Sequence, residues 1–124
     1  MLRSIRFFML VEAVTFIAAA FVHAGLLASG YEHREARIAE SVIAGVLLAG
    51  VAVSWIRPQW TRRAGLATQG FALLGTLVGI FTIAIGIGPR SVADVVYHIG
   101  IVIVLLSGLV VAARAPSGEA RLRA

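Results

Sequence analysis

Apolar and polar positions form long blocks along this chain. Four apolar stretches are separated by three short polar interruptions, SGYEHREAR, RPQWTRR and GPR, and are followed by a polar tail. A helix needs about 20 mostly apolar residues to cross the hydrocarbon core of a bilayer, and each stretch meets that length. The pattern predicts spans at 7–28, 38–56, 64–87 and 92–113.

The short interruptions determine how the predicted helices are connected. Connections of this length make consecutive helices antiparallel neighbours. We therefore expect an all-α integral membrane protein, an up-and-down bundle of four transmembrane helices that forms a single domain over residues 1–124. The polar tail at 114–124 is expected to be mobile.

Composition supports the same class. Hydrophobic residues make up 60% of the chain and charged residues only 14%, whereas soluble domains have about 45–50% apolar and about 25% charged residues. The mean hydropathy is +0.95. The lipid bilayer is thus the first expected partner.

The basic residues, all of them Arg, are unevenly distributed between the two sides of the predicted bundle. Eight of the 11 fall on the side of the chain termini: Arg3, Arg6, Arg57, Arg62, Arg63, Arg114, Arg121 and Arg123. Because cytoplasmic segments carry an excess of Arg and Lys, we predict a multi-pass protein of the inner (plasma) membrane with both termini cytoplasmic.

An alternative exists for the N-terminus. The segment MLRSIRFF, the apolar run after it and the sequence VHA have the outline of a signal peptide that is cleaved after Ala24. The apolar run contains Glu12 and continues past this site through Leu27. These two features favour a retained first span.

Several functional classes are excluded by residue content. The chain contains no Cys, which removes disulfides, thiolate metal sites and a cysteine nucleophile. The net charge is +5, but the arginines are scattered and not clustered with aromatics, so we expect no nucleic-acid partner. No pattern assigns a catalytic residue.

Three predicted helices carry an imidazole or a carboxylate at about the same depth near the outer surface. His23 lies near the end of the first span, and Glu40 and His98 lie near the start of the second and fourth spans. His33 precedes Glu40 by two helical turns on the same face. Imidazole and carboxylate groups from several helices can form a transition-metal site, so we predict His23, Glu40, His98 and His33 as metal ligands.

The two deeper histidines also allow a haem hypothesis. The first and last helices of an up-and-down bundle are neighbours, so His23 and His98 are candidate axial ligands of a b-type haem. Asp94 shares a helix face with His98. Its place in the sequence SVAD, three residues after Ser91, favours the role of a helix cap.

Glu12 provides a further polar position, deeper in the first span. It precedes His23 by 11 residues, about three turns, so both lie on one helix face. Ionisable groups within a span often form proton paths. This stripe predicts a proton path through Glu12 and His23, and therefore a proton- or cation-coupled carrier as the alternative to a metal or haem protein. A purely structural hydrogen bond from Glu12 to a neighbouring helix also fits the sequence.

Small residues recur at intervals of four in the spans, with Gly75 and Gly79 as the clearest pair. Such stripes let helices approach closely, either within one chain or between protomers. A homo-oligomer and an accessory subunit of a larger membrane complex are both compatible with this pattern.

Overall fold

The computed structural model describes residues 1–116 and contains four long α-helices. A 3-10 turn, η1, lies in the second connection. The elements in chain order are α1 (Leu2–His23), α2 (Arg34–Ile56), η1 (Pro58–Trp60), α3 (Thr61–Ala84) and α4 (Val92–Arg114). The all-helical prediction is confirmed, and each long helix is apolar and long enough to cross a membrane by length and composition.

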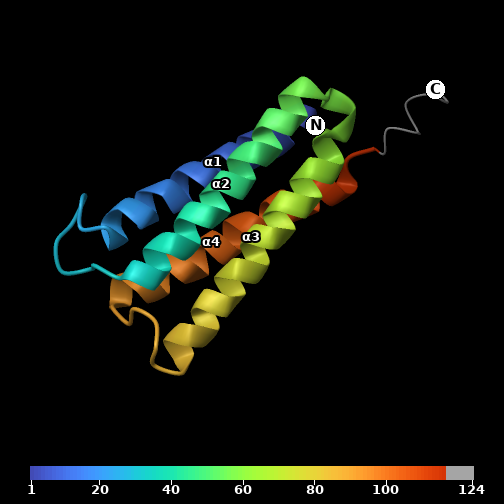
Figure 1. Cartoon of the computed structure of the whole chain (residues 1–124). Coiled ribbons are helices and arrows are strands. Elements are labelled where there is room, and N and C mark those ends of the chain that lie inside the picture. The colour runs from blue at the N-terminus through green and yellow to red at the C-terminus, as the bar shows by residue number, and fades with distance from the viewer. Residues whose placement is uncertain (117–124) are drawn as a thin grey trace.

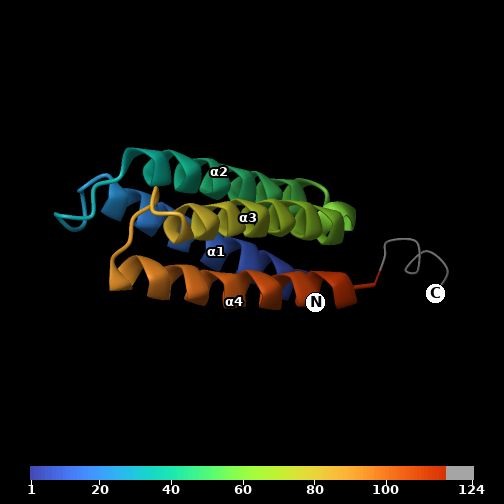
Figure 2. The same cartoon turned by 90° about the horizontal axis from the view of Figure 1, so that it is seen from below.

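The helices lie side by side in an elongated bundle with alternating direction (Figures 1 and 2). Helix α1 contacts α2, α3 and α4, so the first and last helices are neighbours as predicted. The N-terminus, the α2–α3 connection and the end of α4 lie together at one end, called here the terminal end (Figure 1). The loops at 24–33 and 85–91 form the opposite end, the distal end.

Two helices end earlier than the hydropathy pattern predicted, because a glycine follows each of them. Gly25 and Gly86 have φ of 74° and 88°, which side chains with a Cβ rarely adopt. At the end of α1, the Leu26 amide donates to the Phe21 carbonyl at 3.0 Å and the Gly25 amide donates to the Val22 carbonyl at 2.9 Å. This Schellman arrangement stops a helix, so the apolar residues after it belong to loops.

The starts of the helices also differ from the prediction. Helix α1 begins at Leu2, within the polar N-terminal segment. Helix α2 begins four residues before its predicted span, because the His33 side chain accepts a hydrogen bond from the Ala36 amide and caps the helix. Helix α4 is continuous to Arg114, and the rest of the predicted tail is largely residues 117–124, which lie outside the described residues.

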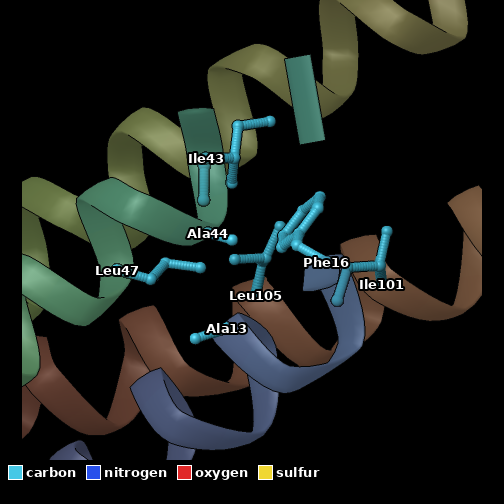
Figure 3. Packing of buried hydrophobic residues seen from close by; sticks show 8 residues of the cluster. Ala13, Phe16, Ile43, Ala44, Leu47, Ile101 and Leu105 are labelled. Carbon is cyan, nitrogen blue, oxygen red and sulfur yellow. The ribbon is translucent and has the colours of Figure 1, made fainter. Parts of the chain in front are cut away.

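An apolar core occupies the middle of the bundle, with contributions from all four helices. Its members are Ala13, Phe16, Ile43, Ala44, Leu47, Ala72, Ile101 and Leu105, most of which are labelled in Figure 3. Gly75 allows α3 to approach α2, since a Cβ there would lie 2.8 Å from Ile43 Cδ1. The predicted small-residue stripe on α3 therefore packs inside the chain.

Candidate functional site

A histidine at the distal end is held between two carboxylates from different helices. His23 Nδ1 lies 2.7 Å from Glu40 Oε2, and His23 Nε2 lies 3.1 Å from Asp94 Oδ1. The three residues come from α1, α2 and α4 and are 4%, 5% and 7% exposed. We call this group the acid–imidazole cluster.

Local structure at the helix ends brings these side chains together. His23 is the last residue of α1, and its carbonyl accepts from the His33 amide at 3.0 Å, which ties the start of α2 to the end of α1. Asp94 lies in the first turn of α4 within a capping box with Ser91. Asp94 Oδ2 accepts from the Ser91 amide at 3.0 Å and also contacts the Ser91 hydroxyl. Its other oxygen remains available for His23.

The hydrogen-bond pattern fits a cluster in which His23 donates from both ring nitrogens. Ionised carboxylates are acceptors only, and an imidazole donates from both nitrogens only when it is positively charged. Two N–H donors from His23 with two carboxylate acceptors give a cluster of one positive and two negative charges. One further proton would neutralise the group. The cluster is therefore a buried group of three titratable side chains whose net charge depends on the number of protons that it holds.

His98 does not join the cluster. Its Nδ1 lies 2.7 Å from the Asp94 carbonyl oxygen, which can only accept, so Nδ1 carries the hydrogen. The Nε2 atom of the neutral ring is then an acceptor. This nitrogen faces α3, where a Cβ added at Gly79 would lie 3.2 Å from it.

The arrangement of the side chains does not support the predicted metal and haem sites. Within residues 1–116, no group of three or more His, Asp or Glu side chains is placed to hold a metal ion. Both nitrogens of His23 already bond to carboxylates, which leaves no lone pair for a metal or for haem iron. His33 Nδ1 is used to cap α2 at 3.2 Å from the Ala36 amide. These contacts therefore support neither a metal ion at these residues nor a haem with His23 and His98 as axial ligands.

Glu12 lies deeper in the bundle, together with Gln69 of α3. Glu12 and Gln69 are both 0% exposed. A Cβ added at Gly108 of α4 would overlap Oε1 of Glu12 and Oε1 of Gln69, so both side chains lie against this glycine. No polar atom of either side chain has a hydrogen-bond partner among the described residues. This pair is a second buried polar point, contributed by α1 and α3.

The polar stripe predicted between Glu12 and His23 is not continuous. The buried residues of α1 between them are Ala13, Phe16, Ala19 and Ala20. Thr15 directs its hydroxyl to the Val11 carbonyl of its own helix at 2.7 Å. Apolar side chains thus separate the two polar points along α1. One of them, Phe16, belongs to the core shown in Figure 3.

A cavity of about 200 Å³ lies beside the cluster, between α2, α3 and α4. Glu40 lines it from α2 and therefore belongs to both the cluster and the cavity wall. Tyr97 and His98 line it from α4. The Tyr97 hydroxyl is buried and has no hydrogen-bond partner within residues 1–116.

Sequence reasoning found part of this site. It placed His23 and Glu40 in one layer, and the structure brings them into contact. It assigned Asp94 to helix capping and missed that the second carboxylate oxygen reaches His23. The sequence did contain one indication of this contact: Asp94 lies in the first turn of α4, at about the same depth in the bundle as His23.

The chain matches no known protein-family description, no curated protein and no solved structure. Two features describe the protein: it is a bundle with four helices of membrane-spanning length, and it has a buried acid–imidazole cluster at one end. Function is inferred from these features.

Proposed function

We propose that this chain is a multi-pass membrane protein. All four long helices have the length and hydropathy of membrane spans. Each also turns large apolar side chains outward, among them Phe7, Val42, Leu74 and Ile103. Apolar surface all around a bundle is unfavourable in water and favourable in lipid.

The proposed orientation puts the terminal end in the cytoplasm of a cell with the bundle in its inner membrane. Arg6 donates to the Ser54 carbonyl at 2.5 Å and stacks 4.2 Å from the Trp55 ring centroid at this end. Arg63 lies 5.9 Å from the centroid of Trp60. Arg and Trp side chains gather at cytoplasmic membrane interfaces, which supports this orientation.

We further propose that the protein is a proton-coupled membrane carrier. The observation that carries the proposal is the buried His23 side chain bonded at 2.7 and 3.1 Å to carboxylates of two other helices. Acid–imidazole groups within membrane helices are costly and typically serve proton relays. A cluster whose charge changes by one with each proton couples proton binding to the packing of α1, α2 and α4.

Glu12 is the second proton-binding site of the proposed carrier. An ionised carboxylate without a partner costs several kcal/mol in an apolar interior, so Glu12 exchanges its proton only when a donor, a cation or water reaches it. Apolar side chains, among them Phe16, separate Glu12 from the cluster along α1. This arrangement favours a carrier that changes conformation over an open proton channel, because a channel needs a continuous polar path.

The test is proton flux in proteoliposomes that enclose a pH-sensitive dye, with valinomycin and potassium to compensate charge. The assay contains no second substrate, so it measures the protons that the carrier passes on its own; an imposed pH gradient should dissipate faster than in protein-free vesicles. Glu12→Gln and His23→Gln should each return the rate to the protein-free value. Glu32→Gln is the matched control, since Glu32 is exposed and its carboxylate accepts only from the Gly30 amide at 2.8 Å; this variant should keep the full rate.

Absence of protein-dependent flux would overturn the carrier proposal. Flux that persists unchanged in both Glu12→Gln and His23→Gln would also overturn it, because protons would then bypass both buried proton-binding sites. Size-exclusion chromatography and circular dichroism establish that each variant is folded before its rate is compared.

A further inference from the structure

The cavity beside the cluster has the size of a small-molecule site. Its volume of about 200 Å³ extends from His33 at the distal end to Gly75 in α3. An apolar protein cavity of about 150 Å³ is large enough to bind benzene. A ligand with one aromatic ring and a short substituent therefore fits this space.

The polar atoms that line the cavity are mainly hydrogen-bond acceptors. Glu40 uses Oε2 to bond His23, and its Oε1 makes no hydrogen bond with the described residues. In the neutral form of His98, Nε2 is an acceptor, because Nδ1 carries the hydrogen that is donated to the Asp94 carbonyl. Thr76 and Thr82 donate their hydroxyl hydrogens to carbonyls of α3 and present only lone pairs. A complementary ligand must therefore supply donors.

The charge of the cavity wall has one sign. Two carboxylates line the cavity, and none of its lining residues is Arg or Lys. Arg90, in the adjoining loop, directs its Nε to the Ile83 carbonyl at 3.3 Å. Behind Glu40, the charge of His23 is matched by that of Asp94, so the cluster leaves the negative charge of Glu40 uncancelled. A cation is favoured here over a neutral or anionic molecule of the same size.

Aromatic and apolar groups form the remaining wall. Phe16 and Tyr97 line the cavity, and their rings meet edge to face with centroids 6.4 Å apart. The face of an aromatic ring attracts an organic cation. The unpartnered hydroxyl of Tyr97 provides one more polar contact inside this otherwise apolar wall.

From these observations we propose that the cavity between α2, α3 and α4 binds a small apolar ammonium ion. The ammonium group donates to Glu40 Oε1 and to His98 Nε2, and the apolar part lies against Phe16 and Tyr97. This proposal rests on the carrier function and names the substrate class for it. Glu40 links the two sites, because the ammonium ion and the proton of the cluster compete for the same carboxylate.

The experiment compares two probes of nearly equal size and different charge. The cationic probe is 4-fluorobenzylammonium, and its neutral partner is 4-fluorobenzyl alcohol. Binding to the full chain in lipid nanodiscs at pH 7 is followed by fluorine NMR, with empty nanodiscs to correct for partition into lipid. We expect saturable binding of the ammonium probe, with a Kd at least tenfold lower than that of the alcohol.

Three variants separate charge recognition from cavity shape. Glu40→Gln should remove the preference for the cation. Gly79→Val places a side chain against His98 Nε2 and should weaken both probes, which keeps the test valid if Glu40→Gln does not fold. Gly45→Val is the matched control, because a Cβ at Gly45 meets nothing within 4 Å, and it should leave both affinities unchanged.

The outcomes distinguish this proposal from the carrier function. Equal affinity for both probes, or no saturable binding of the ammonium ion, overturns the ligand assignment. Proton flux that still depends on Glu12 and His23 would leave the carrier function standing in that case. If the unmodified chain shows neither ammonium binding nor protein-dependent proton flux, both proposals are overturned. Cation binding that Gly79→Val does not weaken shows a different binding site and also overturns the assignment.

Discussion

Glu12 and Gln69 are the residues whose burial is hardest to explain by stability. Both side chains are fully buried, and their polar atoms lack partners within residues 1–116. An unsatisfied buried polar group lowers the free energy of unfolding by about 1–3 kcal/mol. Residues that are retained for packing alone are usually apolar at such positions. The pair is therefore better explained by a function that needs a protonatable group in the middle of the bundle.

This explanation predicts that Glu12→Met stabilises the protein while it abolishes proton flux. Methionine has a similar length and no polar atom to desolvate, so the free energy of unfolding should rise by about 1–3 kcal/mol. The measurement is an unfolding titration with sodium dodecyl sulfate in mixed micelles, followed by circular dichroism. Val14→Met, at a position of the same helix with 62% exposure, is the control and should change the stability little.

A lower free energy of unfolding for Glu12→Met would contradict this view. It would show that Glu12 has a stabilising partner, such as a bound water or the Gln69 amide, and that its first role is structural. The sequence allowed this structural alternative from the start, and the stability measurement separates it from the proton path.

At the scale of a single element, the first turn of α4 performs two tasks with one side chain. Asp94 Oδ2 closes the capping box with Ser91, and Oδ1 bonds His23 of α1. Ser91 Oγ in turn accepts from the Asp94 amide at 3.1 Å. The start of α4 and the acid–imidazole cluster are thus stabilised by the same carboxylate.

The two tasks predict different costs for Ser91→Ala and Asp94→Ala. Loss of the Ser91 cap should lower the free energy of unfolding by about 0.5–2 kcal/mol. Asp94→Ala also removes a hydrogen bond to a charged imidazole, which should cost about 1.5–3 kcal/mol more. Both are measured by the same unfolding titration, with Ser107→Ala as control, since Ser107 is exposed on α4 and bonds only the Ile103 carbonyl of its own helix. Equal losses for Ser91→Ala and Asp94→Ala would mean that the bond to His23 contributes nothing to stability.

The elements themselves were largely predictable, and their ends were not. Hydropathy located all four helices, because the length of an apolar run is a property of the sequence alone. It extended α1 and α3 past Gly25 and Gly86, because an apolar residue such as Leu26 has the same hydropathy in a helix and in a loop. Glycine at the C′ position was the local signal for both ends.

The candidate site was less predictable than the helices for a reason of geometry. Depth along a helix follows from residue number, and it placed His23 and Glu40 at one level. Rotation about the helix axis depends on packing with every neighbour, which one sequence does not encode in a simple pattern. For this reason His98 was expected to face His23, whereas its free nitrogen faces Gly79 of α3.

At the scale of the whole molecule, the distribution of Arg predicts the orientation of the bundle. Eight of 11 arginines lie at the terminal end or in the tail beyond it by sequence. The other three, Arg34, Arg37 and Arg90, belong to the distal end, where the acid–imidazole cluster also lies. For the proposed membrane protein, the positive-inside rule therefore predicts that the cluster and its cavity lie on the side of the membrane opposite the cytoplasm.

The absence of Cys from the chain makes this orientation directly measurable. Ser29→Cys introduces a thiol in the exposed distal loop, and Gln59→Cys introduces one in the exposed α2–α3 connection. In intact cells from which the outer permeability barrier has been removed, a membrane-impermeant maleimide should label Ser29→Cys. It should label Gln59→Cys only after the membrane is permeabilised. The reverse pattern would place the cluster on the cytoplasmic side, and protons and ammonium ions would then reach Glu40 from the cytoplasm.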